Sequence, residues 1–224
     1  KDIVMLVHLG MTGKFFFIDK KKIKYKTSFY YSLNKDKDKK HDRVIFNLSK
    51  NQKLIYNDVR KFGFIKFFNK LSIKKNSHLK NLGPEPIDRT FNLTYFKNYI
   101  IGRKRTIKDI LMDQKFVSGL GNIYVNEILF FSGVRPSRKT KNLSNVEIIK
   151  IIKFTKKILI KAITLGGSSI KNFSSSSGKK GSFQQHFSVY GKKGENCSKK
   201  NCNNIIEKIV LANRASFYCS KCQK

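Results

Sequence analysis

Cysteine is absent from the first 196 residues of the chain, and all four cysteines follow within the last 28. The sequence does not open with a basic region followed by a long apolar run, which is the pattern of a secretory signal peptide. No apolar run approaches the roughly 20 residues that a helix needs to cross a bilayer. We therefore expect no membrane span, and thiol chemistry only at the C-terminal end.

Acidic residues are scarce, since 14 Asp and Glu stand against 48 Lys and Arg, for a net charge of +34. Such positive potential favours a polyanionic partner, with nucleic acid ahead of an anionic membrane surface. Arginine is also scarce, at 8 of the 48 basic residues. The chain is instead rich in Lys, Ile, Asn and Phe, a composition that an AT-rich coding sequence produces. Many lysines are therefore expected on solvated faces. The few arginines are better pointers, because a guanidinium fork fits phosphates and base edges.

The cysteines form two close pairs, C-x4-C and C-x2-C, separated by sixteen residues: Cys197, Cys202, Cys219 and Cys222. Two such pairs can place four thiolates around one tetrahedral Zn²⁺. The intervening NNIIEKIVLANRASFY predicts a hairpin with Arg214 at its tip. Two disulfides in a secreted tail are the alternative, which the missing signal peptide disfavours. We expect one structural zinc ion, with no open position for a catalytic water.

Two patterns of periodicity divide the rest of the chain. Short β-rich runs such as KFFFI, KLIYNDV and GFIKFF in residues 1–70 predict an antiparallel sheet or half a sandwich. From about residue 90, TFNLTYFKNYII, TIKDILMD and NIYVNEILFF predict helices. SNVE at 144–147 predicts a capping box before a long helix whose apolar face holds Ile148, Ile152, Leu159 and Ala162. Residues 166–195 are rich in Gly, Ser and Lys, which predicts a mobile loop.

Gly119 and Gly121 predict a tight turn, with Asn122 opening a helix directly after it. Backbone N–H groups at such a helix start, with a side-chain amide beside them, can bind a phosphate. A plain turn between two helices is equally compatible with this short motif.

Six motifs occur in the order found in formamidopyrimidine-DNA glycosylases, bacterial base-excision repair enzymes: HLGMTG (8–13), KHDRVIF (40–46), NDVRKFGF (57–64), LGPEP (82–86), LMDQKFVSGLGNIYVNEILF and the cysteine tail. The chain resembles this family from residue 5 to Lys224. The resemblance implies an α+β protein with a partial antiparallel β-sandwich, a helix-two-turn-helix domain and a C-terminal zinc-finger hairpin. The implied boundaries are 1–75 for the sandwich, 76–165 for the helical domain, 166–190 for a flexible lesion-recognition loop and 191–224 for the zinc finger.

The implied activity is that of a bifunctional DNA glycosylase and abasic-site lyase for oxidised purines such as 8-oxoguanine and formamidopyrimidines. The R-x-F of VRKFG favours this branch over the endonuclease VIII branch, which prefers oxidised pyrimidines. The family's nucleophile is an N-terminal proline assisted by a glutamate and a lysine, and none of the three has a counterpart in this sequence. We therefore expect a fragment or a truncated reading frame, and a binding module without catalysis is the main alternative. An RNA-associated or ribosome-associated basic zinc protein is a third, less favoured one.

The resemblance also implies roles for individual residues. A wedge that fills the gap left by a flipped nucleotide is implied for Met11, Arg60 and Phe62. Phosphate contacts are implied for His8, His41, Lys104 and Asn122. Core packing is the alternative for Phe62.

The remaining implied roles concern the lesion pocket and the hairpin. Glu127 matches a position near the pocket, although a surface glutamate would explain it as well. Tyr190, with Ser168 and Ser169, lies in the loop that covers the extruded base. Arg214 is implied to enter the minor groove, bind phosphates beside the lesion and assist the second elimination. The expected partner is double-stranded DNA with oxidised bases or abasic sites, bound by a monomer in the bacterial cytoplasm, at the nucleoid.

Overall fold

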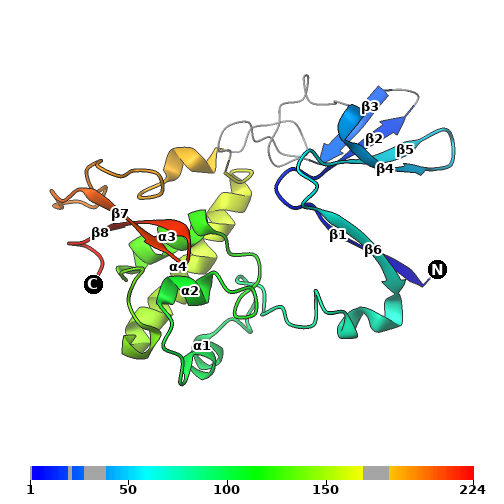
Figure 1. Ribbon diagram of the computed structural model, residues 1–224. Helices are drawn as coiled ribbons and strands as arrows, with labels where there is room; N and C mark the ends of the chain where they lie inside the picture. Colours follow the sequence, from blue (N-terminus) through cyan, green and yellow to red (C-terminus); the bar gives the residue numbers. More distant parts are fainter. Residues whose placement is uncertain (1, 20–21, 28–38, 169–181) are drawn as a thin grey trace. The chain divides into compact units, whose positions relative to one another are not determined.

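The computed structural model describes residues 2–19, 22–27, 39–168 and 182–224 (Figure 1). The chain forms two compact units, one of residues 1–76 and 162–186, the other of residues 77–161 and 187–224. Each unit is described by itself below. Among the described residues, no helix is both long and apolar enough to cross a membrane.

The first unit is built from antiparallel strands: β1 (Ile3–His8), β2 (Lys14–Asp19), β3 (Lys22–Thr27), β4 (Asp42–Asn47), β5 (Lys53–Asn57) and β6 (Phe64–Asn69). One sheet has the order β3-β2-β5-β4, and β1 pairs with β6 in a second, two-stranded sheet. The short 3-10 helices η1 (Lys39–His41), η2 (Lys70–Lys75) and η4 (Phe183–His186) also belong to this unit. The predicted sandwich half is confirmed, and β3 is an additional strand that its lysine-rich sequence KIKYKT concealed.

The second unit is mainly helical, with α1 (Leu93–Ile100), α2 (Ile107–Leu111), α3 (Asn122–Ser132), η3 (Thr140–Asn142) and α4 (Asn145–Thr164), whose last three residues group with the first unit. The predicted helix signals are confirmed. The Ser144 N–H donates to Glu147 at 2.7 Å and the Glu147 N–H donates to Ser144 Oγ at 3.2 Å, which is a capping box. Helix α3 ends where Gly133 adopts a φ of 74°, a left-handed conformation that glycine adopts without steric cost.

All four helices contribute buried side chains to the core of the helical unit, including Phe96 of α1 and Ile110 of α2. Helix α3 is buried almost all round, with Val125, Ile128 and Leu129 fully buried. The buried line of α4 runs through Ile148, Ile151, Thr155, Ile158 and Ala162, spaced at three and four residues. Two predicted core positions, Ile152 and Leu159, are only half-buried, because the apolar face is rotated toward Ile151 and Ile158.

The C-terminal hairpin consists of β7 (Ile206–Leu211) and β8 (Arg214–Cys219). Its two-residue turn places Ala212 at φ 48° and Asn213 at φ 57°, the pattern of a type I′ turn that matches the twist of paired strands. Arg214 follows the turn directly and is exposed, as the sequence predicted.

Candidate nucleic-acid interface

Four thiols meet at the open end of the β7–β8 hairpin. The Sγ atoms of Cys197, Cys202, Cys219 and Cys222 all lie within 4.8 Å of one another. The closest pairs are 3.4 to 3.8 Å apart. Four thiolates at about 2.3 Å from a tetrahedral Zn²⁺ would be about 3.8 Å from each other. The four cysteines can therefore hold one metal ion with little rearrangement.

Burial and the three neighbouring thiols raise the pKa of Cys222 to about 12. A thiol crowded in this way ionises readily only when a cation replaces its proton. The chemistry of the donor set thus favours a thiophilic dication over four free thiols.

In the first unit, the carboxylate of Asp58 holds together the loop that carries Arg60 and Phe62. It accepts hydrogen bonds from the Gly63 N–H at 2.9 Å, the Tyr56 hydroxyl at 3.1 Å, the Arg60 N–H at 3.2 Å and the Thr12 hydroxyl. Burial alone would raise the pKa of Asp58, but these donors outweigh burial and lower the pKa. Gly63 allows the close approach, because a Cβ there would lie 1.8 Å from the Tyr56 hydroxyl.

This loop brings the three predicted wedge residues together. Arg60 Nη1 lies 3.0 Å from the Met11 sulfur, and the Arg60 guanidinium carbon lies 4.4 Å from the centroid of the Phe62 ring. Phe62 is 58% exposed and Met11 is 49% exposed. The alternative that Phe62 packs in the core is therefore wrong. An exposed cation stacked on an exposed ring can insert into a disrupted base stack.

Two of the predicted phosphate-binding residues, both histidines, lie in the same unit. The His8 ring stacks on Phe64 of the paired strand with centroids 5.4 Å apart, and its Nδ1 accepts the Gly10 N–H at 3.1 Å. His41 Nδ1 lies 3.3 Å from Arg43 Nη2. His8 is exposed and His41 is half-buried, so their contact with phosphates stays a prediction.

In the second unit, the side chain of Gln114 shapes the glycine turn before α3. It accepts the Gly119 N–H at 2.7 Å and donates to the Leu120 carbonyl at 3.0 Å. Gly119 has a φ of 79°, and α3 begins at Asn122 as predicted. The Asn122 side chain donates to the Ala215 carbonyl of the hairpin at 3.0 Å, a structural hydrogen bond that the sequence did not predict. If Asn122 also binds a phosphate, it does so in addition to this bond.

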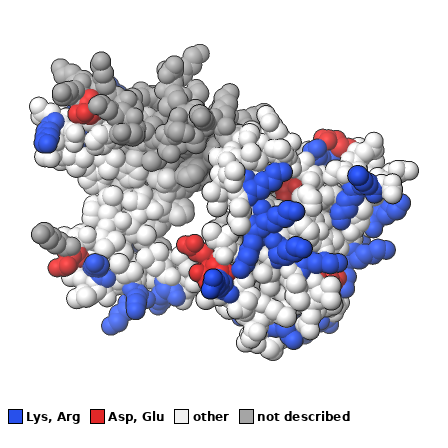
Figure 2. Space-filling model, turned by 180° about the vertical axis from the view of Figure 1, so that it is seen from behind, with Lys and Arg blue, Asp and Glu red and all other residues white. Residues whose placement is uncertain are grey.

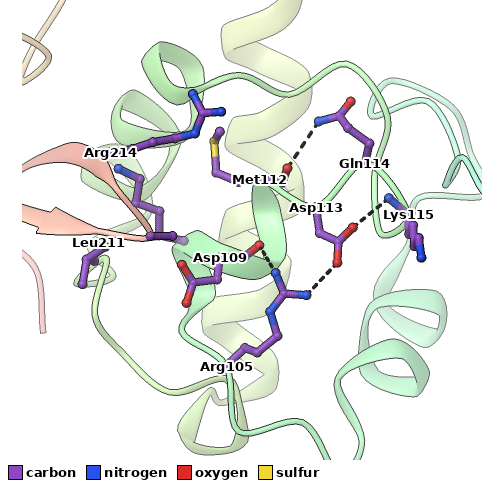
Figure 3. A pocket seen from close by; sticks show the side chains of 10 residues that line it. Arg105, Asp109, Met112, Asp113, Gln114, Lys115, Leu211 and Arg214 are labelled. Atoms are coloured by element: carbon purple, nitrogen blue, oxygen red, sulfur yellow. Dashed lines mark hydrogen bonds and ion pairs between the residues drawn. The ribbon is translucent and has the colours of Figure 1, made fainter.

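Arg214 lines a cavity of about 500 Å³ between the hairpin and α2 (Figure 3). Arg214 and Leu211 enter it from the hairpin, and Met112 lies on the other side with the residues of α2. Its wall also holds an ion pair, Arg105 to Asp113 at 2.6 Å. The cavity thus combines an exposed guanidinium with a mixed polar lining.

Lys108 is buried in the wall of this cavity, with only 1% of its surface exposed. Its Nζ donates to the Ala215 carbonyl at 2.8 Å and to Ser216 Oγ at 2.6 Å. Burial, with a smaller contribution from the neighbouring Arg214, lowers the pKa of Lys108 to about 8 despite the opposing charge of Asp109. No sequence pattern marks this lysine as buried, since it is one of many in a lysine-rich chain.

Glu127 is buried in α3, at 1% exposure, and is not a surface residue. Its carboxylate accepts the backbone N–H groups of Ser188, Val189 and Tyr190 at 2.8, 3.0 and 2.9 Å. Burial raises the pKa of Glu127 despite these three donors. Glu127 thereby ties the segment that carries Tyr190 to the helix.

The other predicted lesion-loop residues are less informative. Ser168 is buried, whereas Ser169 and most of the predicted loop, residues 169–181, lie outside the described residues. Lys104 is exposed in the helical unit, where Figure 2 shows basic side chains gathered over one face. That face includes few acidic side chains, as nucleic-acid binding would require.

Two family models match residues of this chain, one at its N-terminal end and one in its helical part. The model of the formamidopyrimidine-DNA glycosylase N-terminal domain matches residues 1–65, and that of the formamidopyrimidine-DNA glycosylase H2TH domain matches residues 82–174. Formamidopyrimidine-DNA glycosylase of Rickettsia felis is 39% identical over 222 residues, which cover 99% of this chain and 74% of the relative. That of Rhodopseudomonas palustris is 36% identical over 227 residues, covering 99% and 77%.

The chain is also similar to solved structures along its whole length. Lactococcus lactis Fpg in complex with DNA containing an abasic site has a TM-score of 0.81 at 34% identity and covers 100% of this chain and 76% of its own. The wild-type Lactococcus lactis protein with DNA containing N7-benzyl-Fapy-dG has a TM-score of 0.80, with the same identity and coverage.

Proposed function

Because the chain belongs to the formamidopyrimidine-DNA glycosylase family, we propose that it binds double-stranded DNA at oxidised purines and abasic sites in base-excision repair. The observation that carries this proposal is the exposed cluster of Met11, Arg60 and Phe62, held by the Asp58 hydrogen bonds. A cation stacked on an aromatic ring is suited to fill the space left by an extruded nucleotide. The net charge of +34 supports phosphate binding over a wide surface.

Around this cluster, we assign phosphate contacts to His8, His41, Lys104 and Asn122. Arg214 would reach the minor groove from the hairpin tip and assist strand cleavage at the phosphates beside the lesion. Tyr190 would face the extruded base from the segment that Glu127 anchors. We retain the predicted division into residues 1–75, 76–165, 166–190 and 191–224.

The cysteine cluster would hold one zinc ion with a structural role. Four thiolates fill a tetrahedral site, so no coordination position is left for a reacting water. The zinc would keep the hairpin folded, and the hairpin would carry Arg214 to its phosphates. We place this activity on the DNA of the nucleoid, in the bacterial cytoplasm.

Base excision in the family uses an amine that attacks the sugar and forms a Schiff base. The proline, glutamate and lysine that carry out this chemistry have no counterpart in the 224 residues. The exposed cluster of Met11, Arg60 and Phe62, together with Asn122 and Arg214, would supply the binding of damaged DNA that this glycosylase and lyase chemistry requires.

A fluorescent base tests this proposal directly. In a duplex with 2-aminopurine opposite an abasic site, insertion of the wedge should unstack the base and change its fluorescence upon binding. The Phe62→Ala variant should bind with little change in fluorescence. The control Phe67→Ala alters another exposed phenylalanine of the same unit, outside the cluster. An equal fluorescence change for all three proteins would contradict the wedge assignment.

A further inference from the structure

Strand β8, which begins with Arg214, has β7 as its one strand neighbour in the described part of the chain. The two-residue turn makes Leu211 and Arg214 a hydrogen-bonded pair, and the pattern then alternates along the hairpin. The backbone groups of Ala215, Phe217 and Cys219 consequently face away from β7. Such an edge must be paired, covered or hydrated.

Side chains, rather than another strand, satisfy this edge. The Ala215 carbonyl accepts from Asn122 Nδ2 at 3.0 Å and from Lys108 Nζ at 2.8 Å. The Phe217 N–H donates to Asn126 Oδ1 at 2.6 Å, and the Cys219 N–H donates to Gln223 Oε1 at 3.0 Å. We call these four side chains, from Lys108, Asn122, Asn126 and Gln223, the side-chain ladder.

Asn126 is the central member of the side-chain ladder. It is 0% exposed, and its Nδ2 donates to the Asn122 carbonyl one turn earlier at 2.7 Å. That bond directs the amide oxygen at the Phe217 N–H. Strand β8 lies beside α3 (Figure 1). The Asn126 side chain, oriented by α3 itself, sets the register of β8 along the helix.

The thiol cluster and the ladder bonds at Ala215 and Phe217 act on different parts of the hairpin, while Gln223 joins the ladder at the thiol end. Cys219 lies at the end of β8 and Arg214 at its start, five residues or about 17 Å apart along an extended strand. A metal at the thiols fixes the open end, whereas the turn end is fixed by contacts at Ala215 and Phe217. Without the latter, a correctly metallated hairpin could still swing Arg214 away from its place.

We propose that Asn126 is a positioning residue for Arg214, acting through the register of β8 on α3. The consequence for DNA rests on the proposed contact between Arg214 and phosphates. The docking of β8 is a property of the protein alone, so the two can be tested separately.

The first test is backbone amide exchange of the zinc-loaded protein, followed by NMR without DNA. Asn126→Ala removes the acceptor, and exchange of the Phe217 amide should become about tenfold faster, the equivalent of one buried hydrogen bond. Asn126→Asp keeps an acceptor oxygen but loses the Nδ2 donor to the Asn122 carbonyl, so its Phe217 amide should exchange at a rate between those of the wild type and Asn126→Ala. The control Ser132→Ala removes a bond that stays inside α3, from Ser132 Oγ to the Ile128 carbonyl at 2.7 Å. Unchanged exchange in Asn126→Ala, with all variants folded and metallated, would overturn the docking.

The second test is a double-mutant cycle on affinity for a duplex with an abasic-site analogue. Arg214→Ala and Asn126→Ala should each weaken binding by about tenfold and each reduce the salt slope by about one phosphate contact. The double variant should bind like Arg214→Ala alone, since a displaced arginine and a missing one are equivalent. Asn126→Asp should bind with an affinity between those of the wild type and Asn126→Ala.

The outcomes separate the two ideas. Additive losses in the double variant would show that Asn126 acts on general stability and would overturn the positioning role. Wild-type binding by Arg214→Ala would refute the DNA contact under "Proposed function", while the exchange of the Phe217 amide would still decide whether Asn126 docks β8.

Discussion

At the scale of single residues, charge is informative only where the fold constrains it. The chain has 48 basic residues, and most lysines lie on exposed faces, such as Lys150, Lys153 and Lys157 of α4. Arg60 and Lys108 differ from these because a ring stacks on one and a cavity wall encloses the other. These surroundings predict a measurable effect of replacing either residue.

Arg60 should distinguish damaged from intact DNA. Replacing it with Ala removes the guanidinium that stacks on Phe62, while the many other basic residues continue to bind phosphates. The ratio of affinities for abasic and intact duplexes should fall by about tenfold, the effect of one charge-assisted contact, with a smaller change for intact DNA. Fluorescence anisotropy on both duplexes measures this ratio. Arg103→Ala, on α1's C-terminal side, is a matched control that removes an exposed arginine stacked on another ring, Tyr99.

Lys108 should make stability depend on pH in an identifiable window. Burial lowers its pKa from 10.5 to about 8 in the folded protein, so the unfolded chain binds more protons between these values. The cost of burying the ammonium is complete below pH 8 and is relieved as the pH rises toward 10.5. The free energy of unfolding of the wild type, minus that of Lys108→Met, should therefore increase over this range.

Denaturant titrations of the metal-loaded proteins measure this difference, since free thiols would titrate in the same window. Lys97→Met, which removes one exposed lysine, is the control for the loss of a positive charge. A pH-independent difference between wild type and Lys108→Met would contradict the account of this lysine.

At the scale of elements, local signals identified helices and hairpins well. The capping box at Ser144 and Glu147 and the hairpin that carries Arg214 each depend on neighbouring residues, so the sequence predicted them. The long-range bonds could not be predicted in the same way. The contact of Asn126 with Phe217 joins residues 91 positions apart and has no sequence period. The same is true of Glu127, which the sequence left open between a pocket and a surface position.

The C-terminal hairpin should depend on its metal while the helices do not. Cys219→Ser removes one of four ligands, so metal content should fall and β7–β8 should lose order. Helices α1 to α4 should persist, because buried residues such as Ile128 and Ile151 lie outside the cluster that Phe130 of α3 shares with the thiols. Elemental analysis and circular dichroism measure both effects, and Ser220→Ala is the control at the adjacent position. One zinc per chain in Cys219→Ser would refute the four-thiolate site.

At the scale of the whole molecule, the proposed function assigns a different part of DNA binding to each of the two units. The first carries the Arg60 cluster on antiparallel strands, and the second carries Asn122 and Arg214 on a helical body with its hairpin. Ordered motifs predicted this composition because they span both units. They could not predict the hydrogen bonds of Asp58 or the side-chain ladder, which arise only when distant segments pack.

The many basic residues should make binding strongly dependent on salt. Each phosphate that a basic side chain neutralises contributes about −0.9 to the slope of log affinity against log salt. Several contacts would produce a loss of at least about a hundredfold between 50 and 200 mM salt. Titrations at three or more salt concentrations measure the slope, and a slope near zero would exclude phosphate binding as the main source of affinity.

Competition between damaged and intact DNA tests the central claim most directly. The labelled probe is a duplex with an abasic-site analogue opposite cytosine, and the competitor is the unlabelled intact duplex of the same sequence. The account predicts that the intact duplex displaces the probe only at a large molar excess, about tenfold or more, because the intact stack excludes the wedge. Equal displacement by intact and abasic competitors would show that the protein binds DNA by charge alone and would contradict damage recognition.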